Sequence, residues 1–91
     1  MEQINKEVNA MLKKLYIRKC IGRAHMPEEI LLKKVKRIKN KKYRKKIEKQ
    51  WKELENCKYI IRMKKRTKKG MDFHVCLNPK VVFEIEQWLE D

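Results

Sequence analysis

The spacing of apolar residues changes after Asn56, and this change constrains the fold of the chain more than any other feature. Upstream of it, apolar residues recur every three or four positions, which is typical of helices with one buried face. Between residues 58 and 77 they alternate with polar residues, which is typical of strands. Helical spacing returns after Pro79. We therefore expect an α+β fold with three helices, a two-stranded β-hairpin and a C-terminal helix.

Gly22, Pro27 and Asn40 divide the helical part of the chain. Glycine commonly ends a helix, and asparagine is frequent at helix boundaries. Proline fits the first helical turn, where Glu28 and Glu29 favour the positive end of the helix dipole. The three helices are predicted at about residues 3–20, 27–39 and 41–56, with a loop at 22–26.

The third helix has two unlike faces. Its apolar residues occupy about 80° of the helix circumference, and they are Tyr43, Ile47, Trp51 and Leu54. Lysines gather on the opposite side of the same helix. We expect a buried apolar stripe on one face and a basic ridge on the other.

The alternating part of the chain predicts two strands, at about residues 58–64 and 71–77. Residues 59, 61 and 63 share one face of the first strand, and the apolar residues 71, 73, 75 and 77 share one face of the second. We expect both of these faces to be buried. The segment between the strands is basic and ends in Gly70, which predicts a hairpin with a basic tip.

A last helix is predicted at about residues 79–90, with Asn78 as its N-cap and Pro79 at its first position. Phe83 falls about 160° from the middle of the apolar stripe of this helix. An exposed phenylalanine of this kind marks a contact surface, so Phe83 is a candidate dimer contact. The alternative is a single surface aromatic without a role.

The 91 residues leave room for one domain, which we assign to residues 1–91. The longest apolar run, residues 30–32, is too short to span a membrane. Residues 1–7 lack a basic start followed by an apolar stretch, so a secretory signal is not expected. Three cysteines without a CxxC pair favour a reducing compartment. We expect a cytoplasmic protein with no membrane partner.

The positive charge of the chain is concentrated in its middle. The formal net charge is +14, and residues 33–69 alone carry nineteen Lys or Arg and three Glu, a net +16. Residues 70–91 are acidic, with a net charge of −4. Self-repulsion of this kind is tolerated most easily when the partner is a polyanion. A charged surface that only improves solubility is the alternative interpretation.

Three helices followed by a hairpin resemble a winged helix-turn-helix DNA-binding domain, and specifically small archaeal proteins of that type. The stretches that carry the resemblance are residues 22–29, 51–60 and 70–79. The family includes repressors, general transcription factors, RNA-binding ribosomal proteins and protein-interaction modules. The fold alone does not select one of these functions.

The resemblance implies a recognition helix that enters the major groove of DNA and a hairpin wing that contacts the backbone or the minor groove. The matching positions on the helix are Lys41, Lys42, Arg44, Lys45, Lys49 and Lys52. Those on the wing are Lys64, Lys65, Arg66, Lys68 and Lys69.

The candidate recognition helix departs from the pattern of a sequence-specific reader. Side chains that read base edges are usually Arg, Asn, Gln, Ser or Thr, whereas this helix offers mainly lysines. Lysine acts as a point charge and suits phosphates. We therefore expect double-stranded DNA as the partner, bound chiefly through its backbone by a transcription regulator or an architectural protein.

Two other classes of function stay open. An RNA-binding winged helix is favoured by the same lysine richness, but the chain has few aromatic side chains outside its expected core on which bases could stack. A protein-interaction module is the other class, because the acidic last helix and Phe83 could pair with a basic surface of a second copy. A homodimer is therefore a further expectation.

The sequence offers little for catalysis or metal binding. Cys57, His74 and Cys76 are the best zinc candidates, but their spacing does not match a zinc finger, and small buried cysteines are the alternative. The chain has no serine, a single threonine and no glycine-rich phosphate loop. We expect no cofactor and no enzymatic activity.

Overall fold

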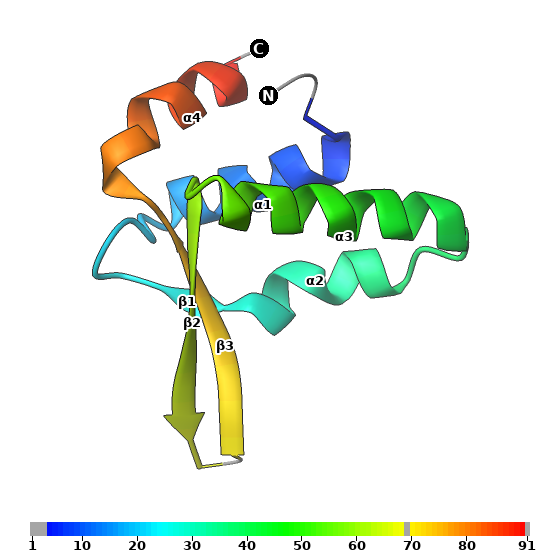
Figure 1. The fold of residues 1–91 in the computed structure, drawn as a ribbon, viewed down its shortest axis with the longest axis horizontal. Coiled ribbons are helices and arrows are strands. Elements are labelled where there is room, and N and C mark those ends of the chain that lie inside the picture. Colours follow the sequence, from blue (N-terminus) through cyan, green and yellow to red (C-terminus); the bar gives the residue numbers. More distant parts are fainter. Residues whose placement is uncertain (1–3, 69, 91) are drawn as a thin grey trace.

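The computed structural model describes residues 4–68 and 70–90, which form four α-helices and a three-stranded antiparallel sheet (Figure 1). In chain order the elements are α1 (Lys6–Ile17), β1 (Met26–Pro27), α2 (Glu28–Lys36), α3 (Lys41–Asn56), β2 (Ile60–Thr67), β3 (Gly70–Leu77), the 3-10 turn η1 (Pro79–Val81) and α4 (Val82–Glu90). The fold is therefore α+β, as the periodicity predicts. Within the described ranges, every helix is too short or too polar to cross a membrane.

Asparagine side chains cap the N-terminal ends of α1, α3 and η1. The Asn5 side chain accepts a hydrogen bond from the Glu7 amide at the start of α1, and the Asn40 side chain accepts one from the Tyr43 amide at the start of α3. Asn78 caps η1 in the same way, with Pro79 at the first position as predicted. The bounds predicted for α3, 41–56, are confirmed.

The first two helices are shorter than the sequence predicts. α1 ends at Ile17 because the chain turns away there, and Lys19 adopts a left-handed φ of +56°. The predicted start at residue 3 lies outside the described residues. α2 ends at Lys36, and Pro27 precedes it as an extended N-cap instead of occupying its first turn.

The prediction of a two-stranded sheet is wrong. Met26 pairs with Val75 and Pro27 with His74, so β1 adds a third strand and the order is β1-β3-β2. β1 falls in the predicted loop and at the predicted helix start. Two residues are too few to show alternation, so sequence periodicity could not find this strand.

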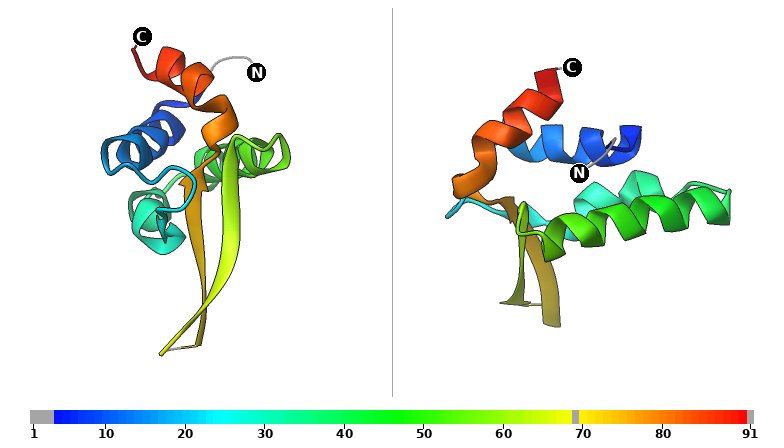
Figure 2. Two further views of the ribbon diagram at one scale, coloured as in Figure 1. Left: turned by 90° about the vertical axis from the view of Figure 1, so that its left-hand side faces the viewer. Right: turned by 45° about the horizontal axis from the view of Figure 1, so that its top comes forward.

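The predicted buried faces of the hairpin are only partly correct. Cross-strand partners share a face, and the register pairs Ile60 with Leu77, so the buried face of β2 contains residue 60 and not residues 59, 61 and 63. Ile61 lies on the other face and is 38% exposed. The expected face of β3 exists, but only its last part is covered, since Val75 and Leu77 are buried while Met71 is 53% exposed. The reason is that the hairpin extends beyond the helices (Figures 1 and 2).

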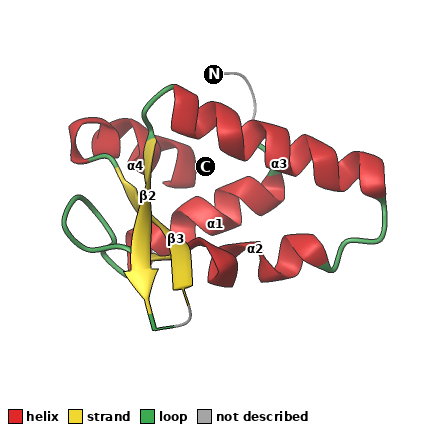
Figure 3. Ribbon diagram, turned by 60° about the horizontal axis from the view of Figure 1, so that its bottom comes forward, coloured by secondary structure: helices red, strands yellow, loops and turns green. Residues whose placement is uncertain are grey.

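The core lies where α1, α2 and α3 pack against the base of the sheet and α4 covers α1. It consists of apolar side chains from every helix and from β1, β2 and β3. Its most deeply buried large side chains are Val8, Leu12, Leu15, Ile47, Leu54, Ile60, Val75, Leu77 and Ile85. Figure 3 shows α3 beside the other helices and the hairpin extending away from them in a different direction.

Candidate nucleic-acid interface

One side of α3 is a row of exposed lysines. Ile47, Trp51 and Leu54 are buried, so they fix which side of the helix faces solvent. At about 100° per residue, the opposite side carries five exposed lysines within about 100° of arc. They are Lys41, Lys42, Lys45, Lys49 and Lys52, and together they are called the lysine row below.

Arg44 does not belong to the lysine row, although the resemblance places it on the same recognition helix. Its side chain is partly buried on the flank of α3 and lies 3.9 Å from the carboxylate of Glu48. It also donates to the backbone carbonyl of Ile38 at 3.4 Å. Arg44 therefore connects α3 to the segment before it, and it is less free for a phosphate than the lysines.

The hairpin carries cations on both of its faces. Cross-strand register places Lys64 opposite Phe73 and Arg66 opposite Met71 on one face. Lys65 lies opposite Asp72 on the other face. These three cations and Lys68 are exposed, whereas Lys69 lies outside the described residues. A partner could therefore contact positive charge from either side of the hairpin.

A buried carboxylate joins the hairpin to the helices. Glu28, at the start of α2, is only 6% exposed, and its carboxylate accepts the indole N–H of Trp51 at 3.0 Å. The same carboxylate accepts the Nε–H of Arg62 at 3.0 and 3.1 Å. The Arg62 guanidinium in turn lies 3.6 Å from the centre of the Phe73 ring. This Glu28 joint connects α2, α3, β2 and β3.

Sequence reasoning missed this joint, because it assigned Glu28 to the helix dipole. The available signal is Arg62, which shares a strand face with Ile60 and so enters a position that should be apolar. A charged residue at such a position requires a charged partner. Sequence alone does not say which acid supplies it.

His25, in the loop before β1, lies against His74 of β3. Nδ1 of His25 is 2.9 Å from Nδ1 of His74, and the two rings are nearly perpendicular. One nitrogen must donate and the other must accept, so at least one ring is neutral. The pKa of His25 is lowered by burial, and further by the positive charges of Lys65 and His74.

The structure does not bring the three zinc candidates together. Cys57 is exposed at the end of α3, and His74 is engaged with His25. Cys76 is buried and its thiol donates to the carbonyl of Gly22, while burial raises the pKa of that thiol. Among residues 4–68 and 70–90 no three His, Cys, Asp or Glu side chains are grouped as metal ligands.

No family model, curated protein or solved structure matches the chain in the comparisons with known proteins. The interpretation of this surface therefore depends on its own geometry. That geometry consists of a straight row of lysines on α3 and a projecting basic hairpin, which are held together at the Glu28 joint.

Proposed function

We propose that this protein is a winged-helix protein that binds double-stranded DNA through α3 and the β2–β3 hairpin, as a transcription regulator or an architectural protein. The observation that carries the proposal is the placement of charge. Residues 33–69, with their net charge of +16, span the end of α2, all of α3 and β2 and the segments next to them, and the lysine row is fully turned toward solvent. An exposed charge row of this kind is the electrostatic footprint of nucleic-acid binding.

The order of the elements supports the winged-helix part of the proposal. α2 and α3 precede a long hairpin, which is the layout that the sequence resembles. The short β1 pairs at the base of β3 and leaves the projecting part of the hairpin free. In this arrangement α3 is the recognition helix and the hairpin is the wing.

The dimensions of α3 suit a DNA groove. Its 16 residues make a helix about 24 Å long, and the major groove of B-DNA admits one helix. The lysine row runs along most of this length, so its charges follow one side of the helix. Since lysine is a point donor, the contacts expected are to phosphates on the two rims of the groove, with little dependence on base sequence.

RNA is the second candidate, and one observation favours it. Phe73, which the sequence assigns to a buried face, is 39% exposed on the hairpin beside Lys64. An exposed aromatic ring near cations is a platform for an unpaired base. Against this, the Arg62 guanidinium already covers the Phe73 ring at 3.6 Å. The deep, narrow major groove of duplex RNA would also exclude α3.

Charge reversal in the lysine row tests the proposal. Lys45→Glu with Lys49→Glu should weaken binding to a random-sequence duplex by at least about 100-fold, because two phosphate contacts become repulsive. The matched control is Lys13→Glu with Lys80→Glu, which changes the net charge equally at exposed positions on α1 and η1. Equal losses in the two double variants would show that only net charge matters and would reject α3 as the docking helix.

A further inference from the structure

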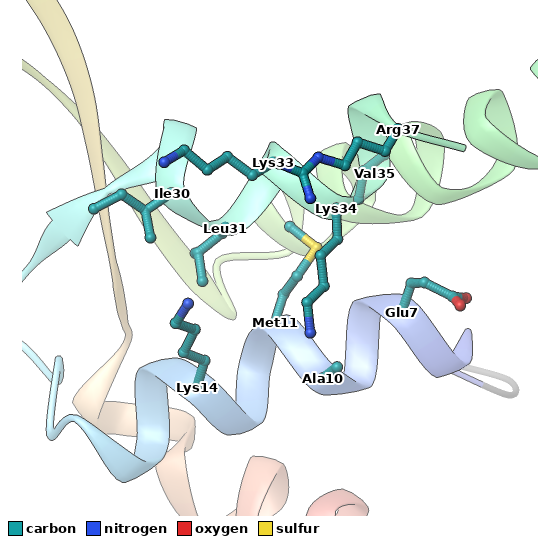
Figure 4. A pocket seen from close by; sticks show the side chains of 10 residues that line it. All are labelled: Glu7, Ala10, Met11, Lys14, Ile30, Leu31, Lys33, Lys34, Val35 and Arg37. Atoms are coloured by element: carbon teal, nitrogen blue, oxygen red, sulfur yellow. The ribbon is translucent and has the colours of Figure 1, made fainter. Parts of the chain in front are cut away.

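A groove between α1 and α2 lies apart from the lysine row (Figure 4). Its volume is about 360 Å³. Apolar side chains from both helices line it, namely Ala10, Met11, Ile30, Leu31 and Val35. This is enough space for one aromatic side chain together with the backbone that presents it.

Cations surround the opening of this groove. Lys14 comes from α1, Lys33 and Lys34 come from α2, and Arg37 directly follows α2. Figure 4 shows Lys14 and Lys34 reaching across the groove toward the opposite helix. One acid, Glu7, also lines the groove and accepts a hydrogen bond from the Tyr43 hydroxyl, so four cations stand against one carboxylate there. The groove therefore suits an apolar group that is accompanied by carboxylates.

α4 presents such a group. Phe83 is 75% exposed, a larger fraction than any other large hydrophobic side chain that the structure describes. Glu84 is adjacent to it and accepts the Tyr59 hydroxyl, and Glu86 lies one turn further along the helix and accepts the Tyr16 hydroxyl, so two carboxylates flank the ring. Residues 82–90 contain three glutamates and no cation, in contrast to the basic character of the chain as a whole.

A protein molecule does not place Phe83 in its own groove. α1 lies between α4 and α2, with α4 on one side of it and the groove on the other (Figure 2). The hydrogen bond from the Tyr16 hydroxyl to Glu86 fixes α4 against α1 on the side away from the groove. Phe83 can therefore enter such a groove only in a second copy.

We propose that Phe83 of one copy occupies the α1–α2 groove of a second copy, with the acids of α4 against Lys14, Lys33, Lys34 and Arg37. Because α4 and the groove lie on opposite sides of α1, two copies do not make both contacts with each other, so the contact is heterologous and builds open rows or closed rings of copies. This proposal is independent of nucleic-acid binding, and it describes association other than a symmetric dimer.

The test uses two variants that each lose one half of the contact. Ala10→Trp fills the groove from an exposed position, and Phe83→Glu removes the aromatic group. The assay is sedimentation velocity at physiological salt, which screens the repulsion between molecules of net charge +14. The wild type should form assemblies larger than a dimer as its concentration rises. Each variant alone should stay monomeric. An equimolar mixture should give dimers only, since one competent Phe83 then meets one competent groove.

A milder pair of variants keeps the proposal testable if Ala10→Trp fails to fold. Lys34→Glu should weaken self-association at least about tenfold, because it reverses a charge at the groove. Lys36→Glu is the matched control, since Lys36 is exposed on the same helix but does not line the groove. The proposal is overturned if the wild type stays monomeric up to about 1 mM, a limit at which binding is negligible. It is equally overturned if Phe83→Glu associates like the wild type, or if Lys34→Glu and Lys36→Glu associate equally.

Discussion

The two basic arms of this molecule, α3 and the β2–β3 hairpin, are held in place in different ways. α3 packs along its length through Ile47, Trp51 and Leu54, all of which are buried. The outer half of the hairpin has no such support, because Met71 and Phe73 are exposed on the face that would have to be covered. The charges of α3 are therefore positioned by the core, whereas those of the hairpin are positioned by the strand ladder and the Glu28 joint.

Under the proposed function, this difference gives each arm a separate task. A helix fixed by the core presents its lysines in one geometry, which suits the placement of the protein on a duplex. A projecting hairpin with cations on both faces presents positive charge to a partner that approaches from either side. Variants in each arm separate these two contributions.

The largest expected effect concerns the support of α3. Ile47→Ala should lower the free energy of unfolding by about 3 kcal/mol, because it removes a fully buried side chain from the core. Met71→Ala, the matching truncation on the hairpin, should change it by less than about 0.5 kcal/mol. Urea denaturation of the two variants measures this contrast. Equal losses would show that the outer hairpin is packed as firmly as α3.

The Glu28 joint should give the next largest effect. Glu28→Ala leaves Arg62 and the Trp51 indole without their acceptor and should cost about 2 kcal/mol, since Arg62 is partly exposed and water can replace part of the contact. The control is Glu29→Ala, an exposed neighbour on the same helix turn, with an expected change below about 0.5 kcal/mol. A double-mutant cycle with Arg62→Ala should show coupling of about 1 kcal/mol, and additive losses would contradict the joint.

The helical half of the fold could be predicted from the sequence because its information is local. The alternation of Tyr43, Ile47, Trp51 and Leu54 with lysines on the other side gives both the bounds of α3 and its exposed row. Both features can be predicted from residue spacing alone, without knowing which elements pack against the helix.

The sheet could not be predicted to the same degree, because its information is not local. The face that β2 buries depends on register with β3, so alternation at 59, 61 and 63 pointed to the wrong side. The two residues of β1 form a strand only because they pair with Val75 and His74 of β3, and local spacing does not indicate this pairing. The Glu28 joint likewise connects residues 34 positions apart, which no spacing rule identifies.

The wing should contribute to DNA binding in a uniform way. Lys65→Ala with Arg66→Ala should weaken binding to every duplex by a similar factor and reduce the slope of log affinity against log salt by about 2. The control is Lys13→Ala with Lys80→Ala, which removes the same charge away from both arms. A slope equal to that of the wild type would show that the hairpin does not reach phosphates.

The smallest effect concerns pH and the base of the hairpin. Because the pKa of His25 is lowered in the folded state, the unfolded state binds more protons once the pH falls below about 6.5. The free energy of unfolding should therefore fall as the pH is lowered from about 6.5 to the folded pKa, and the contribution of His25 to it should be constant above pH 6.5. The urea midpoint measures this effect. His25→Gln should reduce the fall, and an identical pH dependence in the variant would contradict the assignment.

The most direct test of the central claim is the salt dependence of wild-type binding. Fluorescence anisotropy with a labelled random-sequence duplex should give a slope of about −5 to −9 in log affinity against log salt, the value for six to ten phosphate contacts. A structured RNA competitor should displace the protein poorly. A slope near zero, or displacement by RNA as effective as that by duplex DNA, would contradict the account of α3 and the hairpin as a DNA-binding surface.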